Sequence, residues 1–175
     1  MSGSDQRRVW FDRRFELGLP TSAAPDIIER LRGTPLRLEE RLEGLSAERR
    51  SRRTGEAWSI QEHAGHMLEL ETLWLGRVDD FMSGNEELRE ADLENRATWE
   101  AGFNERPVDE ILRAFRRARA ELVSRVEQMD SDGLARTALH PRLRPPMSVV
   151  DLCFFVAEHD DHHLAAITAL RVSAT

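Results

Sequence analysis

Residues 148–170 of the chain read SVVDLCFFVAEHDDHHLAAITAL. A serine followed three residues later by an aspartate, here Ser148 and Asp151, is typical of a capped helix N-terminus. The residues that follow at spacings of three and four share one face of a helix; they are Leu152, Phe155, His159, His163, Ala166 and Leu170. The pattern predicts one long amphipathic helix that carries His159 and His163 on the face directed at the core.

Three earlier segments show the same helical periodicity. The first begins near Pro25 and continues for about 20 residues, the second begins at the cap Ser59 and ends near residue 83, and the third begins near Pro107 and ends before residue 131. No segment shows a convincing strand-like alternation. Because each amphipathic helix needs a partner for its apolar face, the sequence predicts an all-α fold, a four-helix bundle.

Two linkers separate these helices. Residues 84–106 are acidic and are expected to contain one short helical turn near residues 93–99. Residues 140–146 contain three prolines, which exclude a helix there. Linkers of roughly 20 residues allow long crossover connections, so a simple up-down-up-down order is not required.

The chain has 175 residues, which fits one domain of ordinary size. We expect residues 24–175 to form this single domain. Residues 1–23 are expected to form an N-terminal extension that packs on it through its aromatic residues, Trp10, Phe11 and Phe15. No apolar run approaches the about 20 residues of a membrane span, and residues 1–8 lack the apolar stretch of a secretion signal. These features predict a cytoplasmic protein without a membrane segment.

The formal net charge is −7, from 25 basic and 32 acidic residues. A net negative charge disfavours nucleic-acid binding unless the surface carries a local basic patch. The densest basic run, residues 49–53, is expected to be a solvated loop between helices. The single cysteine, Cys153, lies in an apolar run, so we expect a buried and unreactive thiol.

Three histidines are candidate metal ligands. His159 and His163 lie four residues apart and therefore on one helical face, and His66 can occupy the inward face of the second helix. A buried imidazole nitrogen without a partner costs about 1–3 kcal/mol. A divalent cation bound by all three rings removes this cost and leaves positions open for water or substrate. The alternative, histidines that lie on the surface or are hydrogen-bonded, stays open on spacing alone.

The neighbouring residues are less specific. His63 lies one turn before His66, where it can contact a ligand, line a pocket or pack on Trp58, and His162 is expected to flank the site. Glu62 can cap the second helix or orient His66.

The candidates for a general base are Glu62, His63 and Glu69, and no catalytic residue is assigned. Three carboxylates close to the ligands of the last helix can orient a ring or belong to a solvated face; they are Glu158, Asp160 and Asp161.

Two motifs resemble those of the DinB-like superfamily, which includes the YfiT-like proteins. Residues 58–66 read WSIQEHAGH and residues 158–167 read EHDDHHLAAI, and the order and separation of the helices also correspond over residues 24–172. The resemblance implies a four-helix bundle with an unusual crossover topology. It also implies a divalent ion (zinc, nickel, iron or manganese) bound by a triad of histidines, His66, His159 and His163.

Members of this superfamily include S-transferases and isomerases that use low-molecular-weight thiols such as bacillithiol or mycothiol, and metal-dependent hydrolases whose substrates are unknown. The resemblance therefore implies an enzyme that acts on a small molecule, by hydrolysis or by transfer to such a thiol. It also makes a homodimer an expectation. Arg142 and Arg144, just before the last helix, could contact an anionic substrate or serve loop solubility. The competing hypothesis is a non-catalytic binding or assembly protein whose metal is structural or absent.

Overall fold

The computed structural model describes residues 9–172; residues 1–8, which were considered above for a secretion signal, and residues 173–175 lie outside the described part. The α-helices are α1 (Ala24–Leu42), α2 (Ala47–Ser51), α3 (Ile60–Glu69), α4 (Glu71–Met82), α5 (Arg96–Glu100), α6 (Val108–Glu127), α7 (Ser131–Leu134) and α8 (Val149–Val172). The strands are β1 (Thr137–Leu139) and β2 (Pro146–Ser148), and 3-10 helices cover Trp10–Asp12, Thr21–Ala23 and Phe103–Glu105. Within residues 9–172, no helix combines the length and the apolar character needed to cross a membrane.

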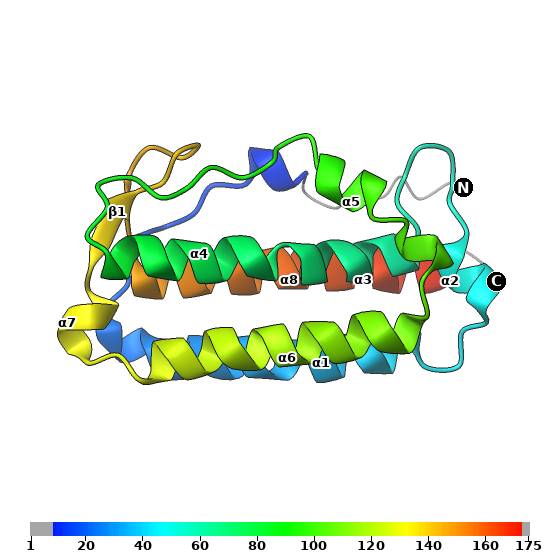
Figure 1. Ribbon diagram of the computed structural model, residues 1–175, viewed down its shortest axis with the longest axis horizontal. Helices are drawn as coiled ribbons and strands as arrows, with labels where there is room; N and C mark the ends of the chain where they lie inside the picture. The colour runs from blue at the N-terminus through cyan, green and yellow to red at the C-terminus, as the bar shows by residue number, and fades with distance from the viewer. Residues whose placement is uncertain (1–8, 173–175) are drawn as a thin grey trace.

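The helices α1, α3 with α4, α6 and α8 are the rods that form the body of the molecule (Figure 1). α3 and α4 lie almost on one axis beside α8, and α1 and α6 form the opposite side of the bundle. α1 and α8 run in one direction, whereas α3, α4 and α6 run in the other. The segment between α4 and α6 must therefore return along the length of the bundle. The predicted four-helix bundle with a long crossover connection is confirmed.

The predicted second helix is divided into α3 and α4 at Leu70. Leu70 stays right-handed, with φ −71° and ψ −12°, and its N–H reaches the carbonyls of both His66 and Leu68. The tighter turn at this residue separates the two helices without redirecting the rod (Figure 1).

Both predicted helix caps are present. Ser59 and Glu62 form a reciprocal capping box at the start of α3, in which each side chain accepts the backbone N–H of the other residue. Ser148 and Asp151 do the same at α8, with distances of 2.9 and 3.0 Å. These caps satisfy N–H groups that a helix N-terminus leaves without intrahelical partners.

Three details differ from the expectations. The proline-rich linker is bracketed by β1 and β2, which pair in antiparallel register and place Ala138 and Met147 in the core. The strands have only three residues each, too few to show an alternating pattern. The basic run is partly helical, because Ser46 caps α2 by accepting the N–H of Arg49. The third helix ends before residue 131 as predicted, but the segment that follows it also folds into a short helix, α7, capped by Asp130.

The N-terminal segment contacts the bundle beside α8. The Trp10 ring lies 5.3 Å from that of Phe15 and 5.1 Å from that of Phe155, measured between centroids. The N–H groups of Gly18 and Leu19 donate to the Asp151 carboxylate. Phe11, in contrast, is 51% exposed. The boundary between extension and domain at residue 24 stays a prediction.

A buried ion cluster links three of the rods. The guanidinium of Arg119 on α6 donates to Glu71 of α4 at 3.0 Å and to Asp160 of α8 at 3.1 Å. Burial raises the pKa of Glu71 to about 7 although the charge of Arg119 acts to lower it. Helical periodicity did not predict this cluster, because the three residues interrupt otherwise apolar faces.

Candidate metal centre

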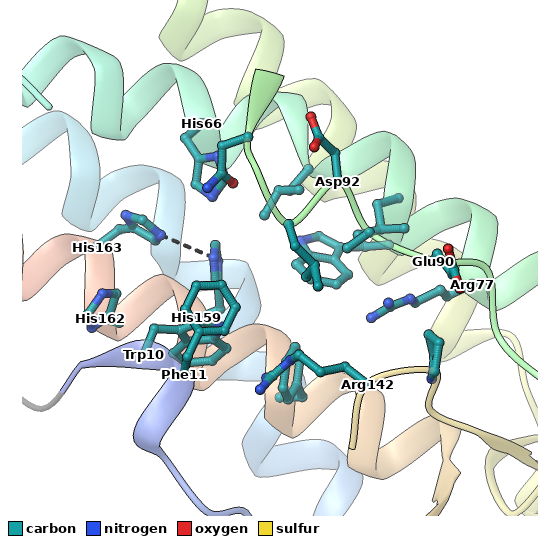
Figure 2. Close-up of a pocket in the computed structure, with 18 of the residues that line it drawn as sticks. Trp10, Phe11, His66, Arg77, Glu90, Asp92, Arg142, His159, His162 and His163 are labelled. Atoms are coloured by element: carbon teal, nitrogen blue, oxygen red, sulfur yellow. Dashed lines mark hydrogen bonds between the residues drawn. The ribbon is translucent and has the colours of Figure 1, made fainter. Parts of the chain in front are cut away.

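His66, His159 and His163 come together inside the bundle, between α3 and α8 (Figure 2). One nitrogen atom from each ring lies within 4.8 Å of the other two. The Nε2 atoms of His159 and His163 are 3.1 Å apart, and all three residues are at most 5% exposed. The spacing of four residues places the two α8 rings on one face, and the inward face of α3 supplies the third.

Hydrogen bonds orient two of these rings. The Nδ1 atom of His66 lies 2.8 Å from the Oγ1 atom of Thr98 on α5, and Thr98 also hydrogen-bonds Glu69. The Nδ1 atom of His163 lies 2.9 Å from the Nδ1 atom of His63. Because the Nδ1 atoms of His66 and His163 form these hydrogen bonds, their Nε2 atoms are the ones that remain to bind a metal ion at the centre of the cluster. Such outer contacts are what set the orientation of histidine ligands in metal sites.

The electrostatic surroundings keep the imidazoles neutral. Burial, with smaller contributions from the charges of His63 and His162, lowers the pKa of His66 to about 3. Burial also holds the pKa values of His159 and His163 well below the ordinary range. Neutral imidazole is the form that binds a metal ion, so a divalent cation fits this donor set. The Nδ1 atom of His159 is buried without a hydrogen-bond partner, so the protein alone leaves this polar group unsatisfied.

The nearby carboxylates serve other purposes. Glu62 accepts hydrogen bonds from Arg53 and from the Ser59 backbone, which outweigh burial and lower its pKa, so Glu62 caps the helix and does not orient His66. Arginines also engage the three carboxylates next to the α8 ligands, Glu158, Asp160 and Asp161.

The three histidines line a pocket of about 360 Å³. Its other walls include Trp58 and Trp74, whose ring centroids lie 4.6 Å from that of His66 and 5.8 Å from that of His159, respectively. Trp10 of the N-terminal segment closes one side, 5.0 Å from the ring of His159 (Figure 2). His162 also borders the pocket, whereas Glu62, His63 and Glu69 are not among its lining residues.

The structure also separates the two arginines that could either contact an anionic substrate or serve loop solubility. Arg142 lines the pocket, but Arg144 is exposed outside it and pairs with Glu87 at 2.7 Å. Two further basic residues of the pocket, Arg77 and His140, were not predicted, and Thr98 was also missed. Arg77 lies on α4, and only the packing of the linkers brings Thr98 and His140 to the site, which no spacing in the sequence signals. Cys153 is buried as expected, with a pKa raised by burial to about 12.

Fold and site together define a four-helix-bundle protein with a candidate three-histidine metal centre. The chain belongs to the DinB superfamily, whose sequence profile matches residues 30–167. This match confirms the resemblance found in the two motifs. A search of curated protein sequences gave no significant match.

Two solved structures share the fold. YfiT from Bacillus subtilis, described as a probable metal-dependent hydrolase with an unusual four-helix bundle topology, superimposes with a TM-score of 0.79 at 15% identity and 93% coverage of both chains. The mycothiol-dependent maleylpyruvate isomerase superimposes with a TM-score of 0.66 at 12% identity. That match covers 84% of this chain and 60% of the isomerase. At such identities the likeness establishes the fold.

Proposed function

We propose that this protein is a metal-dependent enzyme that acts on a small molecule, with His66, His159 and His163 as the metal ligands. The observation that carries the proposal is the convergence of three neutral, buried imidazoles on the wall of a pocket. Three protein ligands beside an open cavity are typical of catalytic metal sites, whereas structural sites are closed by four. This contrast favours an enzyme over the alternative of a non-catalytic binding or assembly protein.

A divalent ion held by three imidazoles lowers the pKa of a bound water or thiol and so supplies a nucleophile near neutral pH. With water the reaction is a hydrolysis, and with a low-molecular-weight thiol it is an S-transfer. The description of YfiT as a probable hydrolase supports the first, and the mycothiol dependence of the isomerase supports the second. The donor set is compatible with zinc, nickel or iron, and the family resemblance adds manganese.

The residues around the triad have positioning roles in this proposal. With the metal bound at Nε2, the remaining ring proton of His66 would lie on Nδ1 and be donated to Thr98, and that of His163 would be donated to His63. Trp58 and Trp74 line the pocket, where their rings would limit the access of water. Glu69 hydrogen-bonds Thr98 and does not line the pocket, so its proposed role is to support the position of His66 rather than to contact substrate.

The first test is elemental analysis of the protein purified without a histidine tag. We expect about one metal ion per chain and loss of this metal in the His159→Ala variant. The matched control is His162→Ala, which removes a neighbouring imidazole outside the triad and should keep the metal. Wild-type protein that is folded but takes up no divalent metal would contradict the proposal.

The second test separates enzyme from structural metal protein. Metal-loaded and metal-depleted protein are compared for ester hydrolysis and for thiol consumption with an electrophile, across several low-molecular-weight thiols. Metal-dependent turnover in either assay supports the enzyme and identifies the reaction type. Stoichiometric metal without turnover in any of these assays would favour a structural metal.

A further inference from the structure

A cluster of basic groups lies in the same pocket, away from the triad. Arg77 projects from α4 and is only 1% exposed, yet no carboxylate in the described part of the chain forms an ion pair with it. Its Nε atom donates to the carbonyl of Arg89 at 3.2 Å. The nearby carboxylate of Asp80 is already bound by the side chain and the backbone N–H of Arg89. The charge of Asp80 and the Trp74 ring, whose centroid lies 5.4 Å from the guanidinium carbon of Arg77, offset the cost of burial only in part, since the pKa of Arg77 stays lowered. A buried guanidinium without a paired carboxylate is costly, so its position calls for an explanation.

His140 places a second donor beside Arg77. Its Nδ1 atom accepts the backbone N–H groups of Arg142 at 3.2 Å and Leu143 at 3.1 Å, so this nitrogen carries no proton. A neutral imidazole then holds its one proton on Nε2. This Nε2 atom lies 3.2 Å from the Nη1 atom of Arg77, which is also a donor. Two N–H groups that face each other make no hydrogen bond, but one acceptor oxygen can receive both.

Arg142 supplies the third basic group. Its Nη2 atom is buried and has no hydrogen-bond partner, and its guanidinium lies 5.2 Å from the centre of the Phe11 ring. Burial lowers the pKa values of Arg77, to about 10, and of Arg142. Burial and the charges of both arginines lower that of His140 to about 3. These shifts are the effect expected when basic groups gather in an apolar cavity and burial outweighs the attraction of the nearest carboxylate, Asp80.

The basic cluster and the triad lie at opposite sides of one cavity. Figure 2 shows Arg77 and Arg142 on one side and His66 and His163 on the other. Apolar side chains, among them Leu73, Trp74 and Phe155, line the same cavity. Glu90 and Asp92 also border it, but both are exposed, and Asp92 accepts the backbone N–H groups of the following turn.

We propose that Arg77, His140 and Arg142 form a subsite for the carboxylate group of a small organic anion with an apolar body. The two N–H groups that face each other and the unpartnered Arg142 N–H provide donors for the two carboxylate oxygens. The cavity of about 360 Å³ is large enough for one such molecule. If the anion is the substrate, its carboxylate would direct the rest of the molecule toward the triad. In naming the substrate class, this inference therefore rests on the proposed function. The subsite itself requires no metal.

The test compares the binding of benzoate and benzamide, which have similar shapes and differ in charge, by isothermal titration calorimetry with the purified full chain. We expect benzoate to bind at least about tenfold more tightly than benzamide, because charge-assisted hydrogen bonds are the stronger ones. Arg142→Gln should remove most of this difference and keep the metal content. The matched control, Arg144→Gln, changes an exposed arginine of the same loop and should bind both ligands as the wild type does.

Two additional variants make the result unambiguous. Arg77→Met tests the buried arginine, and circular dichroism shows whether this variant folds. If the variant does not fold, the result for Arg142→Gln decides whether the subsite exists. His159→Ala, which should lack metal, is expected to retain the preference for benzoate, so failure of the metal proposal and failure of the subsite are distinguishable. Equal binding of benzoate and benzamide, no binding of either, or an Arg142→Gln variant with the wild-type preference would overturn the subsite.

Discussion

A single hydroxyl group positions one of the three candidate ligands. Thr98 lies on α5, in the crossover segment, and contacts the Nδ1 atom of His66 at 2.8 Å. We expect Thr98→Val to weaken zinc binding by about 10–100-fold, because His66 loses the partner that holds its ring. Competition with a chromophoric chelator measures this affinity.

Thr98→Ser is the matched control, since it retains the hydroxyl and should bind zinc nearly as the wild type does. Val is almost isosteric with Thr, so loss of packing does not explain a difference between the two variants. Equal zinc affinity in wild type and Thr98→Val would show that the hydroxyl does not position His66.

A close approach between α3 and the crossover segment depends on a glycine. A Cβ atom at Gly65 would lie 2.2 Å from the Cγ atom of the buried Phe103 ring. We expect Gly65→Ala to lower the free energy of unfolding by about 1–3 kcal/mol, because the ring and its segment must move. Urea denaturation measures the change.

Gly33 provides the comparison on α1. A Cβ atom there meets nothing within 4 Å, so Gly33→Ala should stabilise the protein by about 0.5–1 kcal/mol through helix propensity. If Gly65→Ala and Gly33→Ala changed the free energy of unfolding in the same direction, the packing of Phe103 against α3 would not explain the effect at Gly65. Displacement of Phe103 should also weaken zinc binding, since the same segment carries Thr98.

Taken as a whole, the bundle is held together by polar as well as apolar contacts. Arg119 joins α6 to α4 and α8 through Glu71 and Asp160, and all three side chains are about 1% exposed or less. We expect Arg119→Met to lower the free energy of unfolding by about 3–5 kcal/mol, because two buried carboxylates lose their counter-ion. The midpoint of urea denaturation, followed by circular dichroism, reports this loss.

Arg116→Met is the control from the same helix. Arg116 is 55% exposed and pairs with Glu39 near the surface, where water and salt screen the interaction, so its loss should change stability little. Similar effects of the two substitutions would contradict a special role for the buried cluster.

The amino-acid sequence by itself determined the main helical segments, their caps and the face that His159 and His163 share. These features are local: the spacing of apolar residues sets which face is buried, and Ser59 or Ser148 caps a helix through residues three positions away. His159 and His163 share a face for the same reason. The pairing of His66 with them followed from the two motifs and the expected bundle.

Only the tertiary structure decided the surroundings of the triad. Thr98 reaches His66 from the crossover segment, and His140 reaches Arg77 of α4 from the β1–β2 loop, so both contacts depend on the paths of these connections. The choice of Arg142 over Arg144 as a pocket residue depends on the same loop. Periodicity shows which face of a helix is buried, but long-range packing selects the neighbours that this face meets.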